Sequence, residues 1–170
     1  YPYGCIEQTV SAAFPQLFVS NMMELDEKRQ NEVATNIKAA IERVKTFQTN
    51  EGGFTYWPGN GTPDHWSTSY VGHFLVEAKA KGYDVPQNLI KDWSKFQKKV
   101  ARMWDSKLPA YGFWSIEGHE LSQAYRLYTL ALAGDADMAS MNRLRENPKI
   151  NLSARWRLAA AYALAGKPEV

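Results

Sequence analysis

The sequence has few of the features that place a protein in a disulfide framework, in a membrane or on a nucleic acid. Its single cysteine, Cys5, cannot form an internal disulfide, which leaves the redox compartment open. No apolar run approaches the roughly 18 residues that span a bilayer, so we expect no membrane span in this chain. The formal net charge is only +2, and basic residues gather only in short clusters such as 95–99, so nucleic acid is not indicated as a partner.

The chain also lacks an initiator methionine and a signal-like segment, since it opens at Tyr1. We therefore expect residues 1–170 to be one helical domain that belongs to a larger multidomain protein. A hydrophobic content of 45% with 22% charged residues is typical of a soluble globular domain. We expect no cofactor and no metal site.

Apolar residues recur at helical spacing through most of the chain, and no segment shows a convincing strand pattern. Pro15 should kink or restart the first helix, Asp26 is placed to cap the second, and Gly82 should end the third. The predicted fold class is all-α. The spacing predicts helices over about 6–22, 26–47, 65–82, 86–104, 121–133, 135–146 and 152–165.

Internal repetition indicates how these helices are arranged. The pair Gly53-Phe54 returns as Gly112-Phe113, and the helix start at 65–70 is similar to 119–125. Repeated helix pairs stack on one another to share a core. Periodicity alone leaves open whether the array is an open solenoid of the tetratricopeptide type or a closed arrangement.

Cys5 precedes Gln8 by three residues, at the start of an apolar helical stretch. In that spacing the Cys5 sulfur can attack the Gln8 carboxamide carbon and release ammonia, which closes a thioester ring of about fifteen atoms. A helix that begins here would place Cys5 at the positive end of its dipole, which stabilises a thiolate. The residues alone also permit the plainer interpretation of Cys5 as a small buried hydrophobic side chain.

The run Tyr-Pro-Tyr-Gly-Cys-Ile-Glu-Gln at 1–8 resembles the thioester signature of the alpha-2-macroglobulin and complement superfamily, in its bacterial branch. Animal members usually have glycine where this chain has Ile6. Further resemblance lies in Pro15, in Gly-Gly-Phe at 52–54 and in Trp-Ser-Thr-Ser-Tyr at 66–70. The resemblance implies an α/α toroid of antiparallel helix-pair repeats, of which this chain would hold part of the ring.

The resemblance also implies a function. The chain would be the thioester domain of a broad-spectrum protease inhibitor that traps attacking proteases covalently through their lysine amines. Such a trap is used once and is not an enzyme. Its partners would be the target proteases and the other domains of the parent protein, which would be periplasmic, extracellular or held at the cell envelope.

Several other residues are given roles by the motif. Gly4 and Glu7 would support the Cys5–Gln8 pair, with Glu7 anchoring the loop rather than only favouring the helix dipole. A thioester in water hydrolyses unless it is covered, and aromatic side chains near the motif or in the glycine-rich loop could cover it. The residues expected to shield the bond are Tyr1, Tyr3, Trp57 and Trp66.

A histidine would decide what the thioester attacks. In complement-like members a downstream histidine is acylated first and redirects the bond from amines to hydroxyl groups. His119 is a possible acyl-transfer residue by its distance from Cys5, but it also falls where helix-start residues belong, and His73 fits a packed helix face.

Two other functions remain open at the level of the sequence. One is a helical-repeat protein-binding module in which Cys5 does no covalent chemistry. The other is a cysteine hydrolase with Cys5 as nucleophile, although no local catalytic signature surrounds Cys5. Uptake of one methylamine at Gln8 would distinguish the trap from both.

Overall fold

The computed structural model describes residues 4–59, 61–105 and 118–169, and within these ranges it is helical with no strand. The only β-type pairing there is an isolated antiparallel bridge between Gln48 and Phe54. The chain divides into two compact units, residues 1–93 and 94–170. The prediction of an all-helical chain is confirmed for the described residues. That they form one domain stays a prediction.

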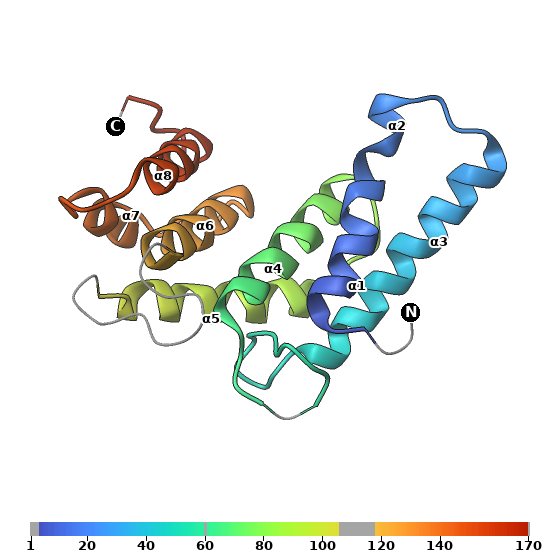
Figure 1. The fold of residues 1–170 in the computed structure, drawn as a ribbon, viewed down its shortest axis with the longest axis horizontal. Helices are drawn as coiled ribbons and strands as arrows, with labels where there is room; N and C mark the ends of the chain where they lie inside the picture. Colours follow the sequence, from blue (N-terminus) through green and yellow to red (C-terminus); the bar gives the residue numbers. More distant parts are fainter. Residues whose placement is uncertain (1–3, 60, 106–117, 170) are drawn as a thin grey trace. The chain divides into compact units, whose positions relative to one another are not determined.

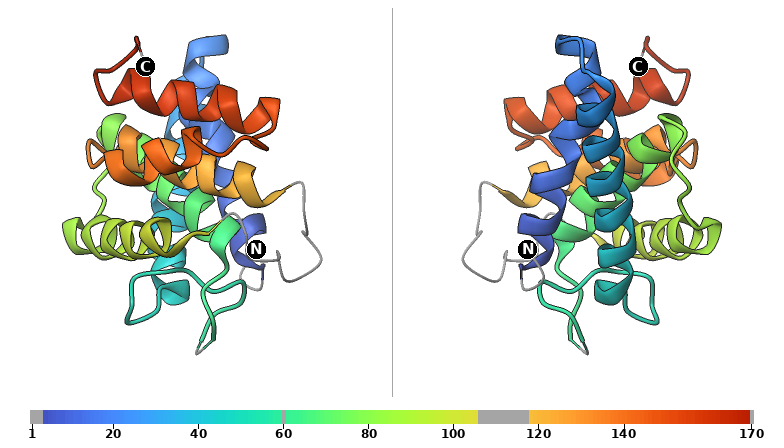
Figure 2. Two further views of the ribbon diagram at one scale, coloured as in Figure 1. Left: turned by 90° about the vertical axis from the view of Figure 1, so that its left-hand side faces the viewer. Right: turned by 90° about the vertical axis from the view of Figure 1, so that its right-hand side faces the viewer.

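The first unit is built mainly on the helices α1, α3 and α4, which contact one another. Helices α1 and α4 run in the same direction, and α3 runs in the opposite direction (Figures 1 and 2). The glycine-rich loop from 48 to 64 lies at the end where α1 and α4 begin (Figure 1). The helices of this unit are α1 (Ile6–Ala13), α2 (Val19–Met22), α3 (Glu27–Val44) and α4 (His65–Ala80), followed by the start of α5 (Gln87–Met103).

Pro15 interrupts the first helix as expected. The α-helix ends at Ala13, and a 3₁₀ helix over Phe14–Phe18 carries the proline in its first turn before α2 resumes. Proline has no N–H to donate and its ring crowds the preceding turn, so a continuous α-helix cannot pass through it.

Aspartate side chains cap α3 and α4, and the cap at Asp26 is the one that the sequence predicts. Asp26 accepts a hydrogen bond from the Arg29 N–H at 2.8 Å, and Asp64 accepts one from the Ser67 N–H at 2.7 Å. Each aspartate satisfies a backbone donor that a helix N-terminus leaves without a partner. The third predicted helix ends at Ala80, two residues before Gly82, whose φ of +87° is a left-handed conformation that favours glycine.

The core of the first unit gathers apolar side chains from all of its long helices and from the loop. Trp93 is fully buried, and its indole N–H donates to the Thr68 carbonyl at 2.9 Å. Satisfying that donor lets the large ring be buried without an unpaired polar atom. The other large side chains that are fully buried here are Ile6, Ile37, Ile41, Phe47, Phe54, Phe74 and Leu75.

The second unit contains the rest of α5 together with α6 (Gly118–Leu132), α7 (Met138–Arg145) and α8 (Leu152–Leu164). Helix α6 packs against both α7 and α8. The core of the second unit is centred on Leu127, Met141, Leu144 and Leu158, all fully or almost fully buried.

Two helix starts in this unit differ from the prediction. Helix α6 begins three residues before the predicted Leu121, so residues 119 and 120 lie in its first turn. Helix α7 begins at Met138 rather than near Asp135, because Asp137 is the residue that caps it by accepting from the Ser140 N–H at 3.0 Å. The Asp135 carboxylate instead accepts from Ser94 and Lys98 on α5.

None of the described helices combines the length and the apolar character needed to cross a membrane.

A substitution at Gly72 should test the packing of the first unit. A Cβ at this position in α4 would lie 2.0 Å from a ring carbon of Trp93. Helix propensity alone favours alanine over glycine by about 1 kcal/mol. We expect Gly72→Ala to lower the free energy of unfolding by about 1–3 kcal/mol, because the buried indole has to move.

Denaturant unfolding followed by circular dichroism measures this change. Gly61→Ala is the matched control, because a Cβ there would meet only ordinary van der Waals contact, 3.5 Å from Thr55. A Gly72→Ala variant as stable as the wild type would show that Trp93 is not held as described.

Candidate functional site

Cys5 and Gln8 lie at the N-terminal end of α1, where the fold brings them together. Cys5 is the N-cap residue, with extended backbone angles and a side chain only 5% exposed. Gln8 is the third residue of the helix, and its side chain folds back so that Oε1 accepts a hydrogen bond from the Cys5 N–H at 3.1 Å. The pair has the reciprocal arrangement of a capping box, with cysteine in the place that serine or threonine usually takes.

Gly4 leaves the space that this folded-back side chain needs. A Cβ at position 4 would lie 3.2 Å from Gln8 Oε1 and 3.3 Å from Gln8 Cβ, which is tighter than ordinary carbon contacts. Gly4 is also buried, so a larger side chain could not turn freely into solvent. The glycine before Cys5 is therefore explained by the close approach of the Gln8 carboxamide.

The first turn of α1 is docked on the glycine-rich loop through one residue, Tyr56. The Ile6 N–H donates to the Tyr56 carbonyl at 3.1 Å. The Tyr56 hydroxyl donates to the Glu7 carboxylate, with 3.1 Å between the two oxygens. Glu7 thus makes a contact with a loop that lies 49 residues away in the sequence.

The loop that carries Tyr56 is itself held by buried hydrogen bonds. The Phe54 N–H donates to Thr68 Oγ1 at 2.9 Å, and the Thr55 N–H donates to the Phe47 carbonyl at 2.9 Å. Gly52 has a φ of +97°, and a Cβ there would lie 2.1 Å from the Asp92 carbonyl oxygen, so only glycine fits the turn. These contacts set the position of Tyr56 from two sides.

The surroundings of Tyr56 favour the protonated phenol. Hydrogen bonding with the side chains of Cys5 and Glu7, together with the negative charge of Glu7, raises the pKa of Tyr56 above its usual range. Ionisation of the hydroxyl would place a second negative charge beside the carboxylate. Tyr56 therefore remains an O–H donor at neutral pH and well into the alkaline range.

The residues predicted to shield the thioester fall into two groups. Tyr1 and Tyr3 lie outside the described residues. Trp57 is 59% exposed and meets the Tyr56 ring edge-on, with 5.7 Å between ring centroids. Trp66, in the first turn of α4, is 41% exposed. The loop aromatic residue that bonds to the turn between Cys5 and Gln8 is Tyr56, through Ile6 and Glu7, and the sequence did not distinguish it from the other aromatic residues of the loop.

The histidines are spread over both units. His73 is half-buried on α4, and its ring meets the Phe14 ring edge-on at 4.9 Å. His65 is the first residue of α4. The backbone of His119 lies in the first turn of α6, and its side chain is outside the description. An acyl-transfer role for His119 stays a prediction.

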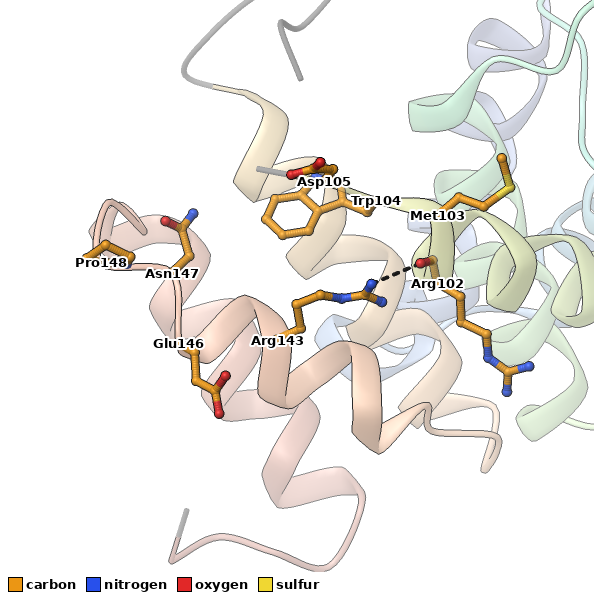
Figure 3. A pocket seen from close by; sticks show the side chains of 8 residues that line it. All are labelled: Arg102, Met103, Trp104, Asp105, Arg143, Glu146, Asn147 and Pro148. Atoms are coloured by element: carbon orange, nitrogen blue, oxygen red, sulfur yellow. Dashed lines mark hydrogen bonds between the residues drawn. The ribbon is translucent and has the colours of Figure 1, made fainter. Parts of the chain in front are cut away.

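The second unit carries a pocket of its own, formed where the end of α5 meets the end of α7. Arg143 lines this pocket and donates to the Arg102 carbonyl at 3.0 Å. The Trp104 ring lies above the Arg143 side chain in the view of Figure 3. None of the predicted site residues lines this pocket. Within the described part of the chain, no cluster of three or more His, Cys, Asp or Glu residues could hold a metal ion.

Comparison with known proteins gives consistent matches. The family described as the A-macroglobulin TED domain matches residues 1–102. The alpha-2-macroglobulin of Escherichia coli (strain K12) is 40% identical over 99 residues, which is 53% of this chain and 6% of that protein. The alpha-2-macroglobulin homolog of Yersinia pestis is 30% identical over 136 residues, which is 79% of this chain and 6% of the homolog.

Solved structures match nearly the whole chain. Salmonella alpha-2-macroglobulin reacted with methylamine superposes with a TM-score of 0.81 at 26% identity, covering 99% of this chain and 11% of that one. Native E. coli alpha-2-macroglobulin, from domain MG7 to the C-terminus, gives a TM-score of 0.80 at 26% identity and covers 99% of this chain and 27% of that one. The chain thus spans only a small part of the proteins it matches.

The structural matches confirm the predicted fold class, an all-α chain of the α/α toroid type. The family match covers the thioester motif, the glycine-rich loop and the start of α4, which are the segments that carried the resemblance in the sequence. This chain belongs to the A-macroglobulin TED domain family, and its relatives are bacterial alpha-2-macroglobulins.

Proposed function

We propose that Cys5 and Gln8 form an internal thioester and that the parent protein uses this bond to capture attacking proteases covalently. The observation that carries the proposal is the hydrogen bond from the Cys5 N–H to Gln8 Oε1, at 3.1 Å. Gln8 Oε1 belongs to the carbonyl that the Cys5 sulfur has to attack. The fold therefore supports the motif with a geometry in which nucleophile and electrophile share one helix turn.

The hydrogen bond also suits the chemistry of bond formation. As the Cys5 sulfur adds to Gln8 Cδ, negative charge builds on Oε1, and the Cys5 N–H is already directed at that oxygen. The tetrahedral intermediate then collapses. The Sγ–Cδ bond remains, the Cδ–Nε2 bond breaks, and the thiol proton leaves on the departing ammonia. The product is a thioester with a ring of about fifteen atoms.

Capture reverses the roles of sulfur and nitrogen. A lysine amine of the protease adds to Gln8 Cδ, the Cδ–Sγ bond breaks, and a proton from the amine ends on the Cys5 sulfur. The amide that forms is more stable than the thioester, because thiolate is the better leaving group. The bond is used once, so the domain acts as a trap and not as an enzyme.

The partners follow from the relatives. A solved relative is Salmonella alpha-2-macroglobulin reacted with methylamine, and others are E. coli alpha-2-macroglobulin activated by trypsin and by porcine elastase. These support amines as acceptors and proteases as the trigger. We place the parent protein in the periplasm, outside the cell or at the cell envelope, where it would meet foreign proteases.

The remaining predicted residues would protect the pair. Gly4 leaves room for the Gln8 carboxamide, and Glu7 anchors the helix start to the loop. Tyr1, Tyr3, Trp57 and Trp66 would exclude water until a protease triggers the protein. Trp57 and Trp66 are partly exposed in this chain, so their shielding would need a neighbouring domain of the parent protein to cover them.

Intact mass and methylamine treatment test the proposal together. The freshly purified parent protein should lack the mass of one ammonia, and methylamine should restore a free Cys5 thiol and add one methylamine at Gln8. A protein-binding module would show neither change. A cysteine hydrolase would turn over substrate repeatedly without modification of Gln8. An intact mass equal to that calculated from the sequence, with no loss of ammonia and no uptake of methylamine, would reject the thioester.

Removal of the nucleophile should abolish capture and spare the fold. In the parent protein, we expect Cys5→Ala to give no covalent protease adducts on denaturing gels. The helical circular dichroism should be unchanged, because loss of one small buried sulfur costs only about 1 kcal/mol. Adducts that persist in this variant would mean that another residue carries the reaction.

A methyl group at Gly4 should hinder formation of the bond. Since the new Cβ would lie 3.2 Å from Gln8 Oε1, we expect Gly4→Ala to push the carboxamide away from Cys5 and lower the fraction of molecules that lose ammonia. Intact mass measures this fraction. Gly61→Ala, whose Cβ would meet only ordinary van der Waals contact with Thr55, is the control and should match the wild type. An unchanged fraction in Gly4→Ala would mean that Gln8 does not need the room that Gly4 provides.

A further inference from the structure

We propose that Tyr56 is a positioning residue for the Cys5–Gln8 reaction, acting as a two-point clamp on the two residues that separate the sulfur from the carboxamide. The inference rests on the proposed function, since a clamp has a chemical consequence only if the thioester forms. Tyr56, a loop residue far from the motif in the sequence, would thereby help to close the thioester ring.

The clamp uses two different groups of Tyr56. Its main-chain carbonyl accepts from the Ile6 N–H at 3.1 Å, and its side-chain hydroxyl donates to the Glu7 carboxylate at 3.1 Å. Ile6 and Glu7 are the two residues between Cys5 and Gln8. Each is therefore held by Tyr56, one through its backbone and one through its side chain.

Restraint of these two residues bears directly on ring closure. The ring of about fifteen atoms runs through the backbone of Ile6 and Glu7, so their freedom sets how often Sγ meets Cδ. Helix ends fray, and α1 begins directly at Ile6. Attachment to an external point reduces that fraying at the one turn where the reaction occurs.

Tyr56 is a suitable fixed point because its neighbours are held by the core. Phe54 is fully buried and bonded to Thr68 through its backbone, and Thr55 is bonded to Phe47. The Thr55 hydroxyl also donates to the Trp57 carbonyl at 2.5 Å, so the residues on both sides of Tyr56 are tied. The clamp therefore connects the reacting turn to the core between α3 and α4.

The hydroxyl keeps its donor role across the useful pH range. Because Cys5 and Glu7 disfavour the phenolate, the raised pKa of Tyr56 retains the O–H at pH values where a free tyrosine begins to ionise. A hydrogen bond from a neutral donor to a carboxylate is also stronger than one between neutral groups.

A single substitution distinguishes a positioning role of Tyr56 from a role in shielding the thioester from water. Shielding would depend on the aromatic ring of Tyr56, whereas clamping at Glu7 depends on its hydroxyl. Tyr56→Phe keeps the ring and the main-chain carbonyl and removes only the hydroxyl. Tyr83→Phe is the matched control, because it removes a hydroxyl from a half-buried tyrosine that follows α4 in the same unit.

The measurement is the rate at which the thioester closes. In the parent protein, ammonia opens the bond and regenerates both Gln8 and the Cys5 thiol. After ammonia is removed, closure of the ring is followed by two measurements: the decrease in free Cys5 thiol and the intact mass of the protein. We expect Tyr56→Phe to close about three- to tenfold more slowly than the wild type and to carry less thioester as purified, the scale of one hydrogen bond to a charged group. Tyr83→Phe should match the wild type.

Variants of Glu7 separate the clamp from a general effect on stability. Glu7→Gln keeps an acceptor for the Tyr56 hydroxyl and should retain most of the closure rate, whereas Glu7→Ala should reproduce the loss in Tyr56→Phe. The double variant Tyr56→Phe with Glu7→Ala should be no slower than Tyr56→Phe alone, because Tyr56→Phe already removes the contact with Glu7. Thermal unfolding should differ little among the variants.

The outcomes distinguish failure of the clamp from failure of the thioester. A wild-type protein that neither lacks ammonia nor takes up methylamine rejects the proposed function. A wild-type protein that carries the bond, with Tyr56→Phe equal to it in thioester content and closure rate, rejects the clamp alone. Additive losses in the double variant also reject it, since Tyr56 and Glu7 would then act separately.

Discussion

The hydrogen bond between the Cys5 N–H and Gln8 Oε1 is the contact on which the other features of the site depend. It requires Cys5 to leave the helix with extended backbone angles, so that its N–H points along the start of α1 rather than into a preceding turn. It requires Gly4, because the returning carboxamide occupies the space of a Cβ. It also directs a backbone dipole at the carbonyl oxygen that would gain charge in the proposed addition of sulfur to the carboxamide.

The architecture of the first unit serves to hold the glycine-rich loop under this turn. The loop lies between the 3₁₀ turn Lys45–Phe47, which follows α3, and the start of α4, and in it Phe54 is fully buried while Thr68 accepts from the Phe54 N–H. Gly72 allows Trp93 to approach α4 closely, and Gly52 allows the loop to pass the Asp92 carbonyl. The loop therefore holds Tyr56, which is itself 40% exposed, next to the buried stretch over residues 52–55.

Much of the fold was predictable because it depends on local interactions. Pro15, the N-cap Asp26 and Gly82 act on their own neighbours, and each ends or starts a helix where expected. The starts of α6 and α7 were misplaced. For α7, Asp135 and Asp137 are both good N-caps by type, and the choice between them is made by Ser94 and Lys98, which bind the Asp135 carboxylate from α5. That competition involves residues distant in sequence and leaves no local pattern.

By itself, the sequence determined that Cys5 and Gln8 lie together, because they are three residues apart at a helix start, with Gly4 directly before them. The part of Tyr56 was decided by tertiary structure alone. Several aromatic residues stand in the loop, and nothing local distinguishes Tyr56 from Trp57, which is 59% exposed. The hydrogen bonds of Phe54 with Thr68 on α4 and of Thr55 with Phe47 fix the chain on one side of Tyr56, and Tyr56 then bonds to Ile6 and Glu7, since a loop's direction is set by the core that anchors it.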